Sequence, residues 1–307
     1  MKLPLKGIIP PIVTPLMSDT ELDIKGLKNL IEHIIEGGVH GVFLLGTTGE
    51  APNLSYELRK EFIEKACEFV DKRIPVVVGI TDTCMAGSLE IANAAKEAGA
   101  DALVISAPYY LPISQSEFVQ YLETLVPQLP LPFMMYNMPS CTKFHMSVAT
   151  VRSAQKLGAI GIKDSSGDMG YLYALLEEFK NSPEFAIIVG TELFIPETMI
   201  NGGHGAVAGG ANLFPRLFVD FYEASVNKDL DKVAEIHEKM MLIENKIYGV
   251  GDYNSKYIKS LKCALSVMGI CNDYVAMPFS KFTPEQKELI ASNLKGMDIF
   301  EASPTKN

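Results

Sequence analysis

The chain repeats one alternation eight times: a short run of β-branched or apolar residues, then a stretch with apolar residues at helical spacing. This alternation is typical of parallel strands joined by crossover helices. Eight strands are the number of a closed (β/α)8 barrel, so we expect an α/β fold of the TIM-barrel type. An open doubly wound sheet is the alternative, but its usual GxGxxG fingerprint does not close the first strand. The expected strands are Ile8–Val13, Gly41–Leu45, Val76–Gly79, Ala102–Ser106, Phe133–Tyr136, Ile160–Lys163, Ala186–Val189 and Ala206–Ala208.

The pattern changes after about Asn227, where only helical periodicity continues. We therefore expect a barrel over residues 1–227 and a C-terminal extension of three helices over residues 228–307. Such an extension covers either its own barrel or another subunit, and both interpretations stay open. The expected helices of the extension are Leu230–Ile247, Ser255–Met268 and Pro284–Leu294.

Composition restricts the class of protein. Apolar residues make up 48% of the chain and charged residues 21%, as in globular proteins with a large core. A formal charge of −10 disfavours a nucleic-acid partner. Pro10, Pro11 and Pro15 interrupt the N-terminal apolar run, which predicts neither a signal peptide nor a membrane span, so a cytoplasmic location is the default. The five cysteines form no CxxC pair and favour reduced thiols.

Lys163 ends the sixth expected strand, and barrel enzymes place their active sites at the C-terminal ends of the strands. Four uncharged residues precede it, so the amine is expected at the edge of the core. Burial disfavours the charged amine, and a neutral amine can attack a ketone to form an imine. The alternative is a structural lysine paired with Asp164 or Asp168.

Other polar residues follow neighbouring strands. Tyr136 ends the fifth expected strand and offers a phenol for proton transfer, although a strand-end tyrosine is more often a core residue. The turn at residues 46–50 contains Thr47, Thr48 and Gly49, whose N–H and O–H donors suit a carboxylate. The same turn could simply cap a helix.

Metal ions and cofactors are not expected. The five histidines show no HxxxH or HxxEH spacing, so a metal site is disfavoured. The glycine-rich segment 202–210 could bind phosphate, as segments near the last strand of barrels often do, but barrel closure also requires small residues.

Several ordered motifs together resemble the dihydrodipicolinate synthase and N-acetylneuraminate lyase family of class I aldolases, which form Schiff bases. The resemblance spans nearly the whole chain. It rests on IPPIVTP at residues 9–15, GTTGE at 46–50, APYY at 107–110, YNMP at 136–139, GIKD at 161–164 and GGHG at 202–205.

The resemblance implies roles for individual residues. Lys163 would be the Schiff-base lysine, Tyr136 the proton-shuttling tyrosine, and Thr47 and Thr48 would lie at the pyruvate carboxylate. Tyr110 would reach into the site of a neighbouring subunit and join a proton relay, which implies a homotetramer built from tight dimers. The resemblance further implies that the carbonyl of the strand-eight residue, Val207, faces the active site.

Two departures from the family pattern concern the substrate. Where the synthases have an arginine for the carboxylate of aspartate semialdehyde, this chain has Cys141, and a thiol cannot replace a guanidinium. Lys143 could supply a cation instead. Ser165 matches a hydroxyl residue of the lyases and Glu192 an acidic sugar contact, but the second acid is Leu193 here.

We therefore expect a carbon–carbon lyase that joins a small 2-oxo acid such as pyruvate to an aldehyde, or cleaves the product. Substrates of the 2-keto-3-deoxy sugar acid or hydroxy-oxoglutarate type fit the missing arginine best. The alternatives are 4-hydroxy-tetrahydrodipicolinate synthase, a keto-deoxy sugar acid dehydratase, and a non-catalytic 2-oxo acid binding protein.

Overall fold

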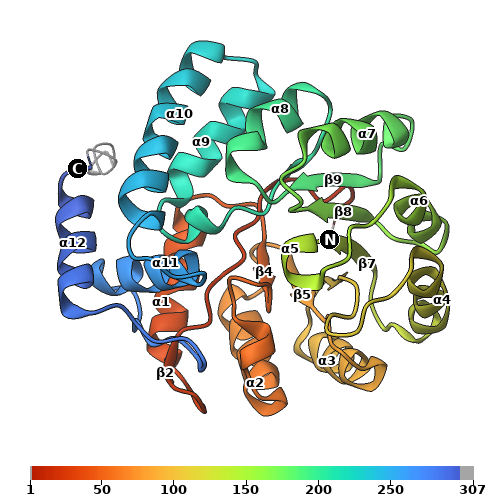
Figure 1. Ribbon diagram of the computed structural model, residues 1–307, viewed down its shortest axis with the longest axis horizontal. Coiled ribbons are helices and arrows are strands. Elements are labelled where there is room, and N and C mark those ends of the chain that lie inside the picture. Colours follow the sequence, from red (N-terminus) through yellow and green to blue (C-terminus); the bar gives the residue numbers. More distant parts are fainter. Residues whose placement is uncertain (1, 298–307) are drawn as a thin grey trace.

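A parallel sheet of eight strands forms the centre of the computed structural model, which describes residues 2–297 (Figure 1). The spatial order is β1-β10-β9-β8-β7-β6-β5-β4, so each strand lies beside its sequence neighbours. The expected TIM barrel is confirmed. The strands are β1 (Gly7–Ile8), β4 (Val42–Leu44), β5 (Val76–Gly79), β6 (Ala102–Ile105), β7 (Phe133–Asn137), β8 (Gly161–Asp164), β9 (Ala186–Val189) and β10 (Gly205–Ala206).

The barrel closes between the first segment of the chain and β4. The N–H of Phe43 donates to the carbonyl of Pro10, and the N–H of Ile12 donates to the carbonyl of Phe43. Pro10 and Pro11 have no N–H, so the regular ladder of the first strand stops at Ile8 rather than at Val13 as expected. The segment nevertheless stays beside β4 and seals the barrel.

Two apolar layers result from the alternation of side chains along the strands. One buried cluster fills the barrel interior and includes Ile9, Phe43, Val104 and Tyr136. The other lies between the sheet and the surrounding helices. These helices are α1 (Ile24–Glu36), α2 (Tyr56–Val70), α3 (Met85–Ala98), α4 (Gln115–Leu125), α6 (Val148–Lys156), α7 (Met169–Phe179), α8 (Ile195–Ile200) and α9 (Pro215–Val226).

Two short elements were not expected from the sequence. An antiparallel hairpin of β2 (Leu16–Ser18) and β3 (Glu21–Leu22) precedes α1, and a single helical turn, α5 (Pro139–Thr142), follows β7. Both are too short to show a hydrophobic period. The turn α5 matters for function because it carries Cys141 to the C-terminal end of the barrel.

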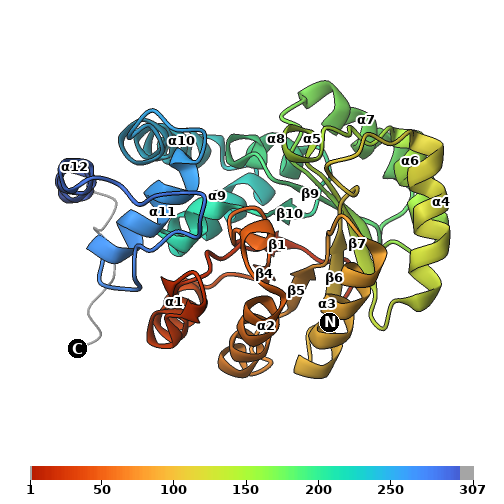
Figure 2. The same cartoon turned by 60° about the horizontal axis from the view of Figure 1, so that its bottom comes forward.

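The C-terminal extension consists of α10 (Leu230–Ile243), a π-helical turn (Glu244–Tyr248), α11 (Lys256–Val267) and α12 (Pro284–Lys295). Figure 2 shows these helices grouped beside α9 and α1 on one side of the barrel. Ile236 of α10 and Leu261 of α11 belong to the same buried cluster as the outer face of the sheet. Residues 298–307 of the expected extension lie outside the described residues. No helix within residues 2–297 combines the length and hydropathy needed to cross a membrane.

Candidate active site

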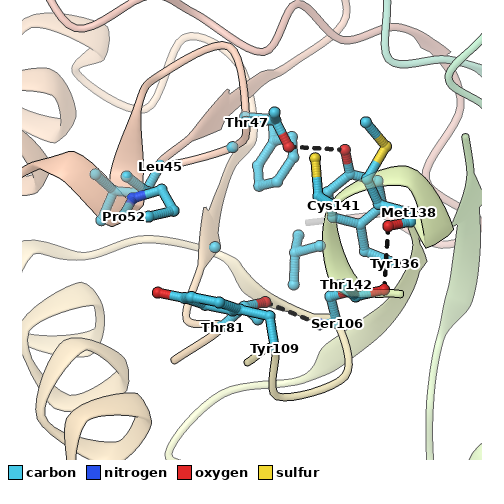
Figure 3. Close-up of a pocket in the computed structure, with 15 residues that line it drawn as sticks. Leu45, Thr47, Pro52, Thr81, Ser106, Tyr109, Tyr136, Met138, Cys141 and Thr142 are labelled. Atoms are coloured by element: carbon cyan, nitrogen blue, oxygen red, sulfur yellow. Dashed lines mark hydrogen bonds between the residues drawn. The ribbon is translucent and has the colours of Figure 1, made fainter. Parts of the chain in front are cut away.

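A cavity of about 340 Å³ opens at the C-terminal ends of β4 to β7 (Figure 3). It lies where barrel enzymes hold their substrates. Its wall is formed by residues near the C-terminal ends of these strands, by the segments that follow them and by the turn α5. The lining residues are Phe43, Leu45, Gly46, Thr47, Ala51, Pro52, Gly79, Thr81, Val104, Ser106, Tyr109, Tyr136, Met138, Cys141 and Thr142.

Lys163 lies deeper in the barrel, against Phe43 and Val104, which also line the cavity. Its side chain is 5% exposed, and its Nζ lies 4.0 Å from the ring centroid of Tyr136 and 5.1 Å from that of Phe43. Lys163 and Tyr136 are register partners on β8 and β7. The amine therefore sits against aromatic faces in a largely desolvated position.

The two carboxylates that could have fixed Lys163 as a structural lysine have other partners. Asp164 accepts hydrogen bonds from Asn137 Nδ2 at 2.8 Å and from the hydroxyl of Ser166 at 2.9 Å. Burial raises the pKa of Asp164, and these hydrogen bonds oppose the rise. Asp168 caps α7 by accepting from the N–H of Tyr171. This geometry favours a reactive role for Lys163 over a structural one.

Tyr136 and Thr47 are joined by a hydrogen bond of 3.2 Å between their hydroxyls, drawn in Figure 3. Tyr136 belongs to β7, and Thr47 belongs to the turn after β4. A phenol in contact with a second hydroxyl can pass a proton through it. Hence the sequence-predicted residues Lys163, Tyr136 and Thr47 meet in one place.

The turn at residues 46–50 is held by short backbone contacts. The N–H of Gly49 donates to the carbonyl of Gly46 at 3.0 Å, and the hydroxyl of Thr14 donates to the carbonyl of Gly49 at 2.7 Å. Thr48 is buried, whereas Thr47 lines the cavity. Glu50 ends the turn with a φ of 58°, a left-handed conformation that a non-glycine residue adopts only when its surroundings hold it there.

Glu50 is held by an ion pair with Lys262 of α11, and both side chains are fully buried. The Glu50 carboxylate also accepts from the N–H of Ala276 at 2.8 Å, and the Lys262 ammonium donates to the carbonyl of Tyr274 at 2.8 Å. Burial lowers the pKa of Lys262, while Glu50 opposes this shift. The extension thus anchors the turn that carries Thr47.

Three further expected residues lie around the lysine and the cavity. Cys141 lines the cavity from α5, whereas the Lys143 ammonium is exposed and donates to the carbonyl of Ser140 at 2.7 Å. Ser165 lies two residues after Lys163 in the sequence. Its hydroxyl lies directly against Gly190, since a Cβ added at that glycine would be 1.9 Å from the Ser165 Oγ. Val207 lies with Lys163 at the deeper level of the barrel.

Glu192 points towards the extension. Its carboxylate accepts from the N–H of Gly210 at 2.7 Å, from Tyr257 at 3.0 Å and from Tyr248 at 3.2 Å. Burial raises the pKa of Glu192 to about 7, and the three donors oppose the rise. The cavity lining does not include Glu192, so the structure brings it together with the extension rather than with Lys163 and Tyr136.

Tyr110 extends away from the barrel and is 90% exposed, with a φ of 96°. Leu111 beside it is 73% exposed. Tyr110 does not line the cavity of its own chain. An exposed aromatic residue on a strained backbone suits a contact with another molecule.

The cavity also includes residues for which the sequence alone suggested no role. Thr81 lies just after β5, and Ser106 ends the fourth expected strand. Both could have been found by the rule that strand ends carry the site. Behind them, Arg59 and Asp82 form a buried ion pair of 3.1 Å, and Tyr56 donates to the same carboxylate. Within residues 2–297, no three His, Cys, Asp or Glu side chains gather as a metal site would require.

Comparisons with known proteins find relatives along nearly the whole chain. The model of the dihydrodipicolinate synthetase family matches residues 4–297. A dihydrodipicolinate synthase structure from Bacteroides thetaiotaomicron is 47% identical, with a TM-score of 0.94 over 96% of this chain and 100% of the other. A 4-hydroxy-tetrahydrodipicolinate synthase from Methanoculleus marisnigri is 30% identical over 92% of this chain and 96% of its own.

A third relative is YagE from Escherichia coli K12, which carries a provisional name as a 2-dehydro-3-deoxy-D-gluconate aldolase. It is 33% identical over 77% of this chain and 80% of its own. Its crystal structure, in complex with pyruvate, has a TM-score of 0.89 over 96% of this chain and 99% of the other, with 29% identity in that superposition.

Proposed function

This chain belongs to the dihydrodipicolinate synthetase family, and from that premise we propose that Lys163 forms a Schiff base with pyruvate or a related 2-oxo acid. Membership makes the chain an enzyme of the class I aldolase and lyase type. One observation carries the assignment to Lys163: its buried Nζ lies against Tyr136, whose hydroxyl is hydrogen-bonded to Thr47.

The proposed reaction begins with the neutral amine of Lys163 adding to the ketone carbon of pyruvate. The resulting carbinolamine takes up a proton on its hydroxyl and loses water, which leaves a protonated imine. This imine withdraws electrons, so the methyl carbon of pyruvate releases a proton and becomes a nucleophilic enamine. The enamine carbon then bonds to the aldehyde carbon, whose oxygen takes up a proton, and water hydrolyses the imine. Cleavage follows the same steps in reverse.

Tyr136 is proposed to move these protons, and the proposal is supported by its phenol, which lies near the amine and is hydrogen-bonded to Thr47. The turn at residues 46–50 is proposed to seat the carboxylate of the 2-oxo acid through the hydroxyls of Thr47 and Thr48, because the N–H of Gly49, expected as a further donor, already donates to the carbonyl of Gly46. Val207, beside the lysine, and Ser165, two residues after it in the sequence, are proposed to contact the bound imine.

Reductive trapping tests this mechanism. Incubation with pyruvate and borohydride should add the mass of a reduced pyruvate adduct to the peptide that contains Lys163. The fully buried Lys262 serves as an internal control, because its ammonium is paired with Glu50 and its peptide should stay unmodified. Lys163→Ala should abolish trapping and turnover while circular dichroism stays that of the folded protein. A folded wild-type protein that traps no 2-oxo acid would rule out the mechanism.

The acceptor is proposed to be an aldehyde that yields a 2-keto-3-deoxy sugar acid or a hydroxy-oxoglutarate product. Cys141 supports this choice over the synthase reaction with aspartate semialdehyde, because a thiol lines the cavity where the synthases have an arginine. Dehydration of a keto-deoxy sugar acid through the same imine is the second candidate. Product analysis separates them, since an aldolase releases pyruvate and a dehydratase releases water.

We further propose a homotetramer built from tight dimers in a cytoplasmic setting. The 90% exposed Tyr110 supports the tight dimer, in which it would complete the relay of a neighbouring subunit. The free state of all five cysteines suits a reducing compartment. Sedimentation at several concentrations tests the assembly, and Tyr110→Ala should lower both dimer stability and turnover.

A further inference from the structure

Two polar residues lie directly behind the proposed catalytic pair. Asn137 follows Tyr136 and ends β7. Asp164 follows Lys163 and ends β8. Successive side chains of a strand point to opposite faces, so Asn137 and Asp164 point towards the surrounding helices while the catalytic pair lies in the barrel interior. Neither residue lines the cavity, so both can act on the catalytic pair but not on a substrate.

A hydrogen bond joins these two side chains across the strands. Asn137 and Asp164 are register partners, and the amide Nδ2 of Asn137 donates to the carboxylate of Asp164 at 2.8 Å. Both residues are buried, with exposed fractions of 0% and 2%. At the same level the N–H of Ser165 donates to the carbonyl of Asn137 at 2.9 Å. The side-chain hydrogen bond therefore reinforces the last paired residues of β7 and β8.

Each of the two side chains is fixed by further donors. The amide oxygen of Asn137 accepts from the N–H of Met146 at 3.0 Å, which ties β7 to the segment that follows α5. The carboxylate of Asp164 accepts from the N–H of Ser166 at 3.2 Å and from its hydroxyl at 2.9 Å. Buried polar groups are costly unless their partners are in place, so such a network favours a single arrangement of the strand ends.

That arrangement sets the distance between the proposed catalytic groups. Lys163 and Tyr136 leave from neighbouring strands, one residue before Asp164 and Asn137, and the amine lies 4.0 Å from the ring centroid of the tyrosine. Proton transfer needs the two groups within hydrogen-bond reach during the reaction. A small shift of one strand end against the other would change this distance, whereas the fold could remain.

From these contacts we propose that Asn137 and Asp164 are positioning residues, which hold the Lys163 amine and the Tyr136 phenol at the separation that proton transfer requires. The proposal rests on the Schiff-base mechanism proposed above. It assigns the two residues a role in the rate of the chemical step and none in the binding of the 2-oxo acid.

Hydrogen exchange at the methyl group of pyruvate tests this role without any aldehyde. In heavy water the imine on Lys163 releases a methyl proton to give the enamine, the enamine takes up a deuteron, and hydrolysis releases deuterated pyruvate. Proton NMR gives kcat and KM for the exchange. Asp164→Ala removes the acceptor of the Asn137 amide, and kcat should fall about 10- to 100-fold, the effect of a displacement of about 1 Å. KM should stay near the wild-type value, because the proposed carboxylate seat follows another strand, β4.

Two further variants separate geometry from charge and from general damage. Asp164→Asn keeps an oxygen that can accept from Asn137, so kcat should return to within about threefold of wild type. The double variant of Asn137→Ala and Asp164→Ala should lose little more than either single variant, because both break the same hydrogen bond.

Asp101→Ala is the matched control at the opposite end of the barrel. The carboxylate of Asp101, just before β6, accepts from the N–H of Val76 at 2.9 Å and so links β6 to β5 at their N-terminal ends. Its loss should lower the free energy of unfolding in urea but leave the exchange kcat within about twofold, because residues at that face of a barrel contribute to stability. If circular dichroism shows that Asp164→Ala does not fold, Ser166→Ala replaces it. That change removes one donor to the Asp164 carboxylate and should lower kcat about threefold.

The outcomes distinguish this proposal from the one on which it rests. A wild-type protein that neither exchanges nor traps pyruvate would remove the Schiff-base mechanism, and the positioning role with it. If the wild type exchanges, an unchanged kcat in folded Asp164→Ala or in its replacement overturns the positioning role. A loss in Asp164→Asn as large as in Asp164→Ala also overturns it, since charge would then be the cause. A lower kcat that Asp164→Asn restores and Asp101→Ala does not show supports it.

Discussion

Glu50 and Lys262 form a fully buried ion pair that joins the turn after β4 to helix α11 of the C-terminal extension. Glu50 lies three residues after Thr47, whose hydroxyl meets Tyr136 in the cavity. A buried charge is tolerated only while its partner stays in place, because both were removed from water. The pair therefore couples the folding of the extension to the position of the proposed carboxylate-binding turn.

Breaking this pair should be costly. Lys262→Met leaves the Glu50 carboxylate buried without its counter-ion, and we expect the free energy of unfolding to fall by about 3–5 kcal/mol. Urea denaturation measures the change. Lys239→Met is the control, since Lys239 pairs with Glu235 at the surface and its loss should cost under about 1 kcal/mol. Equal losses in the two variants would contradict the anchoring role.

Tyr136→Phe should separate imine formation from proton transfer. The ring that packs against Lys163 is retained while the hydroxyl that meets Thr47 is lost, so we expect kcat to fall by a factor of about 10² to 10³. Pyruvate should still be trapped on Lys163, although more slowly. Tyr171→Phe removes another buried hydroxyl, one with no partner in the described chain, and should leave kcat unchanged.

Cys141→Arg should change which acceptors the enzyme accepts. The thiol lines a wall without formal charges, and a guanidinium at this position would pair with a carboxylate. We expect kcat/KM for succinic semialdehyde, an anionic aldehyde, to rise at least about tenfold relative to glyceraldehyde. Cys141→Ser, which adds no charge, is the control. No change in the acceptor ratio for Cys141→Arg would show that this wall does not meet the acceptor.

The barrel could be predicted from the sequence because its strands and helices have different hydrophobic periods, and each is set locally. The same rule placed Lys163 and Tyr136 at strand ends, and the structure puts them in register. Long-range pairing was not predictable in this way. Lys262 lies in an amphipathic helix, where a lysine is usually solvated. Its partner Glu50 follows β4, far away in the sequence, so no local pattern indicates the ion pair. Nothing near Glu192 in the sequence indicates the two tyrosines whose hydroxyls donate to its carboxylate.

Glu192 should make stability depend on pH. Because burial raises its pKa to about 7 in the folded protein, the folded state holds a proton that the unfolded chain, with the ordinary pKa of 4.5, has already released. The contribution of Glu192 to the free energy of unfolding is therefore fully present below pH 4.5 and is lost as the pH rises through 7. Tyr248, Tyr257 and Glu244 surround the carboxylate, and the pKa of each of them is also raised, chiefly by burial.

Glu192→Gln keeps the shape of the side chain but removes the titration. Between pH 4.5 and 7.5 we expect wild type to lose on the order of 1 to 3 kcal/mol more stability than the variant. Urea denaturation at intervals across this pH range gives the slope of the free energy of unfolding against pH for each protein. Glu197→Gln, on the same connection between β9 and β10, serves as the control for a general effect of removing one carboxylate. Parallel slopes for wild type and Glu192→Gln would mean that Glu192 is ionised throughout and that its three donors outweigh burial.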